Sequence, residues 1–260
     1  MKKTKFGVVA CIGFSVLLLG GCGSKVDEKA VSAFGNGVLR FKDVKSAEYK
    51  VEASGKIDGE NGKFIVDGAY DLRDKMGADL NVSIESQGVK MANVITLSLK
   101  DSVLYMDAMS NKQSITFETV KPMLTSLIEG QKDVKFTKKN KEELTNVLSK
   151  ASLEDNKLSL EFDMKALNKE IKKLDNKEAK DMEVKKLNFT GTVNKKYLET
   201  GKIMFEIHNK GTKETIKFTV KYSLKNMNKD VKLKDVVPTE FGIPVDAMQF
   251  FGGSMPPLMN

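Results

Sequence analysis

The chain has 260 residues, of which 40% are hydrophobic and 30% charged, and a formal net charge of +8. This length is ample for a buried core, and two cysteines are too few for a disulfide scaffold. The positive charge lies almost wholly on lysine, which is less suited than arginine to bidentate contacts with phosphates and bases, so we do not expect a nucleic-acid partner.

The first 25 residues have the layout of an export signal. A basic segment at 1–5 precedes an apolar run at 6–19, which is short for a membrane span. The next residues, Leu19-Gly20-Gly21-Cys22, resemble the lipobox of bacterial lipoproteins, in which the cysteine thiol is acylated and the chain is cut before it. We expect a signal peptide at 1–21, a lipid anchor at Cys22 and a short tether at 22–25. The protein would then lie on the extracytoplasmic face of the cell membrane.

The next part of the chain predicts one helix and then a meander. Apolar residues at helical spacing predict an amphipathic helix at 26–41. From residue 47 the period changes to two, which predicts strands at 47–57, 64–72, 76–85, 89–99, 103–107 and 114–118, with Gln87-Gly88 as a hairpin turn. Polar Asp79, Asn81 and Ser83 alternate with apolar neighbours. We therefore expect an antiparallel sheet with one solvent-facing and one dry face.

Helical spacing returns at 120–130 and at 140–151, where Asn140 and Glu143 resemble a capping box. A strand at 158–164, a lysine-rich helix at 165–180 and a three-strand meander at 184–225 follow. The remainder, 231–260, contains four of the five prolines and is predicted to be an irregular tail with a helical turn at 245–251.

No linker composition interrupts residues 26–230, so we expect a single α+β domain. About ten strands sharing one dry face predict a strongly curved antiparallel sheet, a half-barrel, whose concave face is covered by the helices.

Signals for catalysis are nearly absent. His208, the one histidine, alternates with Lys202 and Glu206 on the polar side of its strand, which is typical of a surface residue. There is no G-x-S-x-G elbow and no calcium loop, and 58–61 is typical of a plain turn. We predict no catalytic residue, metal or cofactor, and we do not expect an enzyme.

The dry face is the remaining candidate site. An apolar stripe is most often core packed by helices, but only a few short helices are available here to fill the concave side of a wide sheet. Medium-sized and flexible side chains on that side would suit acyl chains. We expect an apolar cavity lined by Val51, Phe64, Val66, Leu80, Val82, Ile95, Leu97, Leu124, Leu127, Leu160, Phe162, Phe189, Phe205, Ile207, Phe218 and Val220.

A family resemblance points the same way. The lipobox, the N-terminal helix, SAEYKVEASGKI at 46–57, GAYDL at 68–72 and SVLYM at 102–106 together resemble the LppX/LprG-type lipoproteins, which are similar in turn to the LolA/LolB carriers. The resemblance spans roughly residues 26–225. It implies a half-barrel closed by helices around a cavity that binds acyl chains, with only Cys22 transferable position by position.

Two functions stay open at this point. The first is a membrane-anchored monomer that carries or presents a lipid or glycolipid in its cavity, because exposed acyl chains need an apolar container. The alternative is an interaction protein with a fully packed core, whose lysine-rich outer face contacts a protein or wall polymer.

Overall fold

The computed structural model describes residues 26–57, 60–73, 76–116, 135–173 and 181–246. These residues form two compact units. The meander unit consists of 42–54, 60–73, 76–116 and 222–246, and the helical unit consists of 26–41, 55–57, 135–173 and 181–221. The predicted anchor Cys22 and the predicted helix at 120–130 lie outside the described residues.

The meander unit is built from hairpins. Its strands are paired in the order β12-β6-β5-β4-β3-β2-β1, and the turn between β3 and β4 has positive φ at Gln87 (51°) and Gly88 (80°), as a tight two-residue hairpin requires. Among the described residues of this unit, β2 and β3, β3 and β4, β4 and β5, and β5 and β6 pair antiparallel, whereas β12 pairs parallel with β6. The strands are β1 Ser46–Ile57, β2 Glu60–Asp71, β3 Gly77–Ser86, β4 Val89–Lys100, β5 Val103–Ala108, β6 Asn111–Thr116 and β12 Val245–Asp246.

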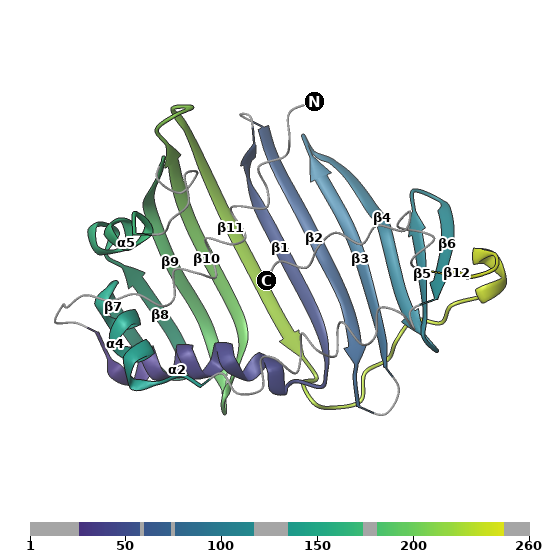
Figure 1. Ribbon diagram of the computed structural model, residues 1–260, viewed down its shortest axis with the longest axis horizontal. Coiled ribbons are helices and arrows are strands. Elements are labelled where there is room, and N and C mark those ends of the chain that lie inside the picture. Colours follow the sequence, from purple (N-terminus) through teal and green to yellow (C-terminus); the bar gives the residue numbers. More distant parts are fainter. Residues whose placement is uncertain (1–25, 58–59, 74–75, 117–134, 174–180, 247–260) are drawn as a thin grey trace. The chain divides into compact units, whose positions relative to one another are not determined.

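The helical unit carries three α-helices on a second set of strands, paired in the order β11-β10-β9-β8-β7. Figure 1 shows α4 and α5 beside β7, β8 and β9. The elements are α2 Glu28–Leu39, α4 Lys138–Asn146, β7 Leu148–Glu154, β8 Lys157–Phe162, α5 Met164–Ile171, β9 Met182–Asn194, β10 Tyr197–Asn209 and β11 Glu214–Lys225. Short 3-10 turns, η2 Arg40–Asp43 and η3 Pro238–Phe241, complete the secondary structure.

The α+β class and the antiparallel sheet are confirmed. Within each unit the strands follow one continuous hydrogen-bonded order. Curvature of this sheet, and helices over a concave face, stay predictions.

Helix α2 packs closely on the apolar side of its own unit. Its N-terminus is capped by Asp27, whose carboxylate accepts from the backbone N–H of Lys29. Phe34 meets Phe189 of β9 edge to face at 4.9 Å between ring centroids. A Cβ added at Gly37 would lie 2.6 Å from Cγ of Leu198, so the helix approaches β10 as closely as glycine permits. The predicted helix at 26–41 is therefore confirmed.

The predicted helix at 140–151 is wrong in its second half. Helix α4 ends at Asn146, and Leu148 and Ala151 belong to β7, where they pair with Phe162 and Leu160 of β8. The capping box also differs, because Thr137 is the N-cap and exchanges hydrogen bonds with Asn140. Leu144, Val147, Leu148 and Ala151 have helical spacing, although the helix ends at Asn146 and a strand begins at Leu148.

Lysine-rich helix α5 ends at Ile171, earlier than the predicted 165–180, and 174–180 lie outside the described residues. The helical turn predicted at 245–251 is wrong at its start, because Val245 and Asp246 form β12, a parallel partner of β6. Residues 247–251 are outside the described part of the chain.

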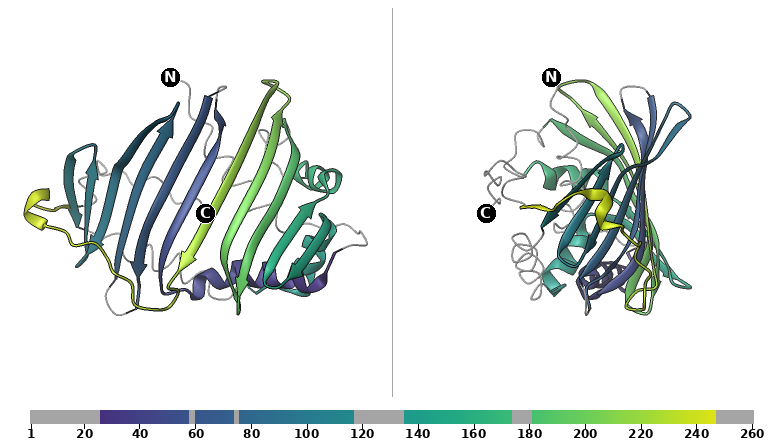
Figure 2. Two further views of the ribbon diagram at one scale, coloured as in Figure 1. Left: turned by 180° about the vertical axis from the view of Figure 1, so that it is seen from behind. Right: turned by 90° about the vertical axis from the view of Figure 1, so that its right-hand side faces the viewer.

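The C-terminal segment 226–244 covers the polar side of the meander unit. It runs past the ends of β3 and β4 towards β6 (Figure 2). It is fixed at its start by Asn228, whose N–H donates to the Ser46 carbonyl at 2.8 Å. Near its end, Phe241 packs edge to face on Tyr105 at 5.3 Å, and Lys112 pairs with Glu240.

The expectation of a solvent-facing polar side is therefore wrong for its central residues. Asp79, Asn81 and Ser83 are 4, 5 and 8% exposed. Their burial is tolerated because they are hydrogen-bonded. The Lys234 backbone N–H donates to Asp79 and the Lys234 ammonium to Asn81, whereas Ser83 accepts from the Asn93 backbone N–H of the neighbouring strand at 3.1 Å. Polar alternation marked the correct side of the strands, but it could not reveal that the distant C-terminal segment lies over it.

Candidate functional site

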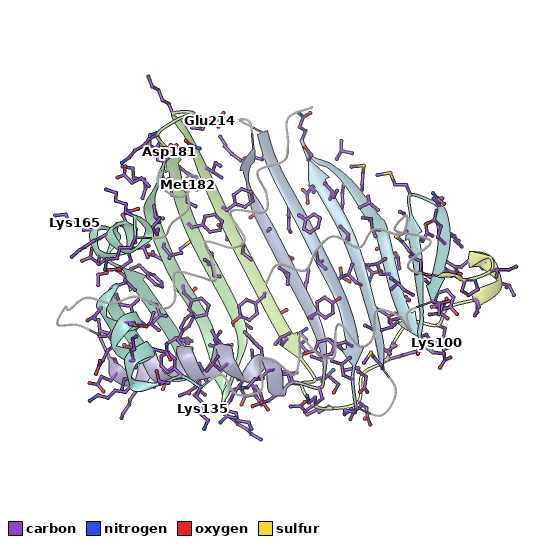
Figure 3. All side chains as sticks on the ribbon, in the orientation of Figure 1. Lys100, Lys135, Lys165, Asp181, Met182 and Glu214 are labelled. Carbon is purple, nitrogen blue, oxygen red and sulfur yellow. The ribbon has the colours of Figure 1, made fainter. Side chains whose placement is uncertain are left out.

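The candidate site is the apolar face of β2–β6 in the meander unit. Cross-strand partners in an antiparallel sheet share a face, so the register aligns the apolar residues in rows. The row beside Lys100, which Figure 3 labels at the end of β4, joins Ala78, Leu99 and Leu104. The next rows join Leu80 with Leu97 and Met106, Val66 with Val82 and Ile95, and Phe64 with Ile84 and Met91.

This face keeps a large exposed fraction for an apolar surface. Phe64, Met91 and Ile95 are 42, 45 and 37% exposed, and they lie in the two rows nearest the β3–β4 hairpin. Leu80, Leu97 and Val66 are half-buried, whereas Val82 is buried. A contiguous apolar surface of this kind is typical of a binding site rather than of a finished core.

The candidates on the meander unit come together as predicted. Phe64, Val66, Leu80, Val82, Ile95 and Leu97 occupy three adjacent rows of β2, β3 and β4. Val51 is half-buried in β1 of the same unit. The predicted set omitted four residues of the same face, although they show the same period-two alternation in the sequence: Ile84, Met91, Leu104 and Met106.

The candidates on the helical unit lie in a more tightly packed setting. Leu160, Phe162, Phe189 and Ile207 are 0, 7, 4 and 6% exposed. Phe205 and Phe218 are half-buried and stack on each other at 5.6 Å, and Val220 is also half-buried. Leu124 and Leu127 lie outside the described residues. The buried four contribute to the core beneath α2 and α5, so the open part of the candidate set is on the meander unit.

Two tyrosines border the apolar face at its Lys100 end. The Tyr49 hydroxyl donates to the Asp79 carbonyl at 2.9 Å, and its ring lies 6.2 Å from that of Tyr70. Burial, together with the charges of Asp67 and Asp79, raises the pKa of Tyr49 to about 12. A Cβ at Gly68 would clash with the Asp79 carbonyl and lie 2.8 Å from the Tyr49 hydroxyl, so glycine leaves room for this hydrogen bond. Both phenols are neutral at physiological pH and give this end of the face a polar border.

Groups suited to other chemistries are sparse in the described residues. Histidine, cysteine and carboxylate side chains form no group of three or more that could hold a metal ion within that part of the chain. The His208 ring lies within hydrogen-bond distance of Thr215, with Nδ1 and Oγ1 3.1 Å apart. Over the same residues, no helix is both long and apolar enough to cross a bilayer.

Comparisons with known proteins find the chain similar to lipoproteins at the level of structure. No family model matches it, and no curated protein matches its sequence. It is similar to the lipoprotein LppX of Mycobacterium tuberculosis, with 10% identity over 80% of this chain and 100% of that one and a TM-score of 0.38. LprF of Mycobacterium bovis is 10% identical over 82% of this chain and 99% of that one, with a TM-score of 0.39. A LolA superfamily protein of Nitrosomonas europaea is 10% identical over 85% of this chain and 99% of that one, with a TM-score of 0.23. The resemblance expected from the sequence is thereby confirmed as a resemblance, and at TM-scores below 0.5 it carries no argument about function.

Proposed function

We propose that this chain is a lipid-binding lipoprotein that is anchored to the outer side of a cell membrane through Cys22 and holds acyl chains against the apolar face of the meander unit. The observation that carries the proposal is the exposure of Phe64, Met91 and Ile95, which lie in adjacent rows of apolar side chains across β2, β3 and β4.

The energetics of acyl chains favour a container of this kind. Covering an acyl chain is worth about 0.8 kcal/mol per methylene, so a sixteen-carbon chain gains on the order of 12 kcal/mol when it leaves water. The exposed side chains would lose contact with water at the same time. Binding of this kind requires shape and apolar surface but no catalytic group.

A short tether would keep the protein close to the membrane. Val26 is the first described residue and forms a parallel bridge with Ala151 of β7. Only residues 23–25 separate an acylated Cys22 from Val26, a reach of roughly 14 Å in extended chain. A tethered carrier of this kind would collect or deliver lipid near the bilayer surface.

An interaction protein remains the second candidate for one specific reason. Helix α4 presents Lys138 and Lys139 with 91 and 83% of their side chains exposed, although each has an i,i+4 glutamate 3.8 Å away. An anionic wall polymer or protein could contact them. Surface charges of this kind are most often only solvated, so the apolar face carries the stronger argument.

The test compares two identical substitutions in the Cys22→Ser chain, which lacks the site of covalent lipid. Ile95→Gln places an amide on the apolar face. Ile243→Gln makes the same change at a residue of the C-terminal segment that is 90% exposed. Noncovalently bound lipid is extracted with organic solvent and measured by mass spectrometry.

The proposal expects co-purified lipid in the Cys22→Ser protein and in Ile243→Gln, and a several-fold lower yield in Ile95→Gln. Thermal unfolding of all three proteins checks that the difference does not come from loss of structure. If no lipid is recovered from any of them and an apolar dye does not bind, the interaction protein is the better reading.

A further inference from the structure

One glutamine interrupts the apolar face. Gln113 lies on β6 opposite Met106, which is itself opposite Leu97, so it extends the row of Leu80 by one strand. Strand spacing places it about 10 Å from Leu97 across the sheet. Its neighbour on the same side, Ile115, is buried, so the amide is the polar end of an apolar row.

Only the nitrogen of the Gln113 side-chain amide has a hydrogen-bond partner among the described residues. Its Nε2 donates to Oδ1 of Asn111, and the two atoms are 3.5 Å apart. Its Oε1 is buried and has no hydrogen-bond partner among the described residues. A carbonyl oxygen has two lone pairs, and folded proteins rarely leave such an atom buried and unused.

We propose that Gln113 recognises a hydrogen-bond donor on the bound lipid, so that the ligand is an acyl lipid with a hydroxyl or amide N–H next to its chain. This inference rests on the proposed function. The acyl chain would cover the rows of Leu80 and Val82, and the donor would reach Oε1 at β6. Mono- and diacylglycerols and glycolipids have such donors, whereas triacylglycerols, simple alkyl esters and hydrocarbons do not.

The geometry explains why a donor gives selectivity. A ligand without a donor would leave Oε1 buried and unpaired, as it is now, whereas a hydroxyl would satisfy it. One hydrogen bond to an otherwise unpaired buried atom changes affinity by about 5- to 100-fold. The apolar rows would contribute equally to both kinds of ligand, because their contacts do not depend on the head group.

The experiment measures two probes of equal acyl length on the Cys22→Ser chain. Monopalmitoylglycerol has hydroxyl donors and methyl palmitate has none. The proposal expects the glycerol ester to bind about 5- to 100-fold more tightly. Gln113→Met, which keeps the length of the side chain but removes the acceptor, is expected to abolish that preference and keep the affinity for methyl palmitate. Met106→Leu, an apolar change at the neighbouring position, is expected to retain the preference.

Different results separate the two proposals. Equal affinities for both probes in the unsubstituted protein, or a preference that survives Gln113→Met, would overturn the role of Gln113 and leave lipid binding intact. Failure of both probes to bind would count against the proposed function, and with it this inference.

Discussion

Replacing Asn81 by leucine tests whether the polar side of the meander unit is covered. The sequence pattern treats Asn81 as a surface residue, for which this change would be nearly neutral. In the structure it is 5% exposed, and its amide contacts Asp67, Thr96 and Lys234. We therefore expect Asn81→Leu to destabilise the protein.

The hydrogen bonds of Asn81 set the size of the effect. Two of its partners are charged, the Lys234 ammonium and the Asp67 carboxylate, and bonds to charged groups contribute about 1.5–3 kcal/mol each. A buried leucine returns about 1.5 kcal/mol through its apolar area. The two terms leave a net loss of about 1.5–4.5 kcal/mol in the free energy of unfolding.

Urea unfolding measures this loss as a lower midpoint with an unchanged slope. Asn111→Leu, at an exposed position of β6, is the control and is expected to change stability by less than about 0.5 kcal/mol. In a double-mutant cycle, Lys234→Met combined with Asn81→Leu should cost less than the sum of the single changes, because both remove the same contact. Equal midpoints for Asn81→Leu and Asn111→Leu would refute the burial of this side.

Two further predictions concern packing and pH. Gly37→Ala normally stabilises a helix, but here it should destabilise the helical unit by about 1–2 kcal/mol, because the new Cβ would lie 2.6 Å from Cγ of Leu198. Thermal unfolding measures the change. Gly62→Ala is the control and should be neutral or stabilising, because a Cβ at Gly62 has no neighbour within 4 Å. The pKa of Tyr49 is about 12 when folded and 10.0 ordinarily, so the stability that its neutral phenol provides is complete below pH 10 and is lost as pH rises towards 12. Tyr49→Phe should make this alkaline loss smaller, and an unaltered pH dependence of unfolding would contradict the burial of that hydroxyl.

Much of the architecture could be predicted because local patterns determine it. Period-two alternation located β1–β6 and β8–β11 to within a few residues, and Gln87-Gly88 identified a hairpin turn whose positive φ angles the structure confirms. The position of helix α2 could also be predicted, since Phe34 lies on a regular apolar stripe and Asp27, a favourable N-cap residue, precedes the helix. In each case the deciding interactions lie within one element or its immediate neighbour.

The errors arise where distant residues decide. Leu144, Val147, Leu148 and Ala151 fit a helical stripe, yet pairing with β8 draws the last two into a strand. Asp79 and Asn81 fit a solvated face, yet Lys234, more than 150 residues away in sequence, covers them. Neither outcome follows from periodicity, because the competing partner is not nearby in the chain.

The same limit applies to the candidate site, where periodicity predicts a face but not its cover. Leu160 and Ile95 have the same alternating pattern, yet Leu160 is fully buried in the helical unit and Ile95 is 37% exposed on the meander unit. A polar substitution at Leu160 would therefore reduce stability whether or not lipid binds, since it would leave an unpaired polar group in the core. At Ile95 the new amide can still reach water, so the fold can survive while the apolar row is interrupted. A loss of bound lipid at Ile95 thus reports on binding, whereas the same loss at Leu160 would report only on folding.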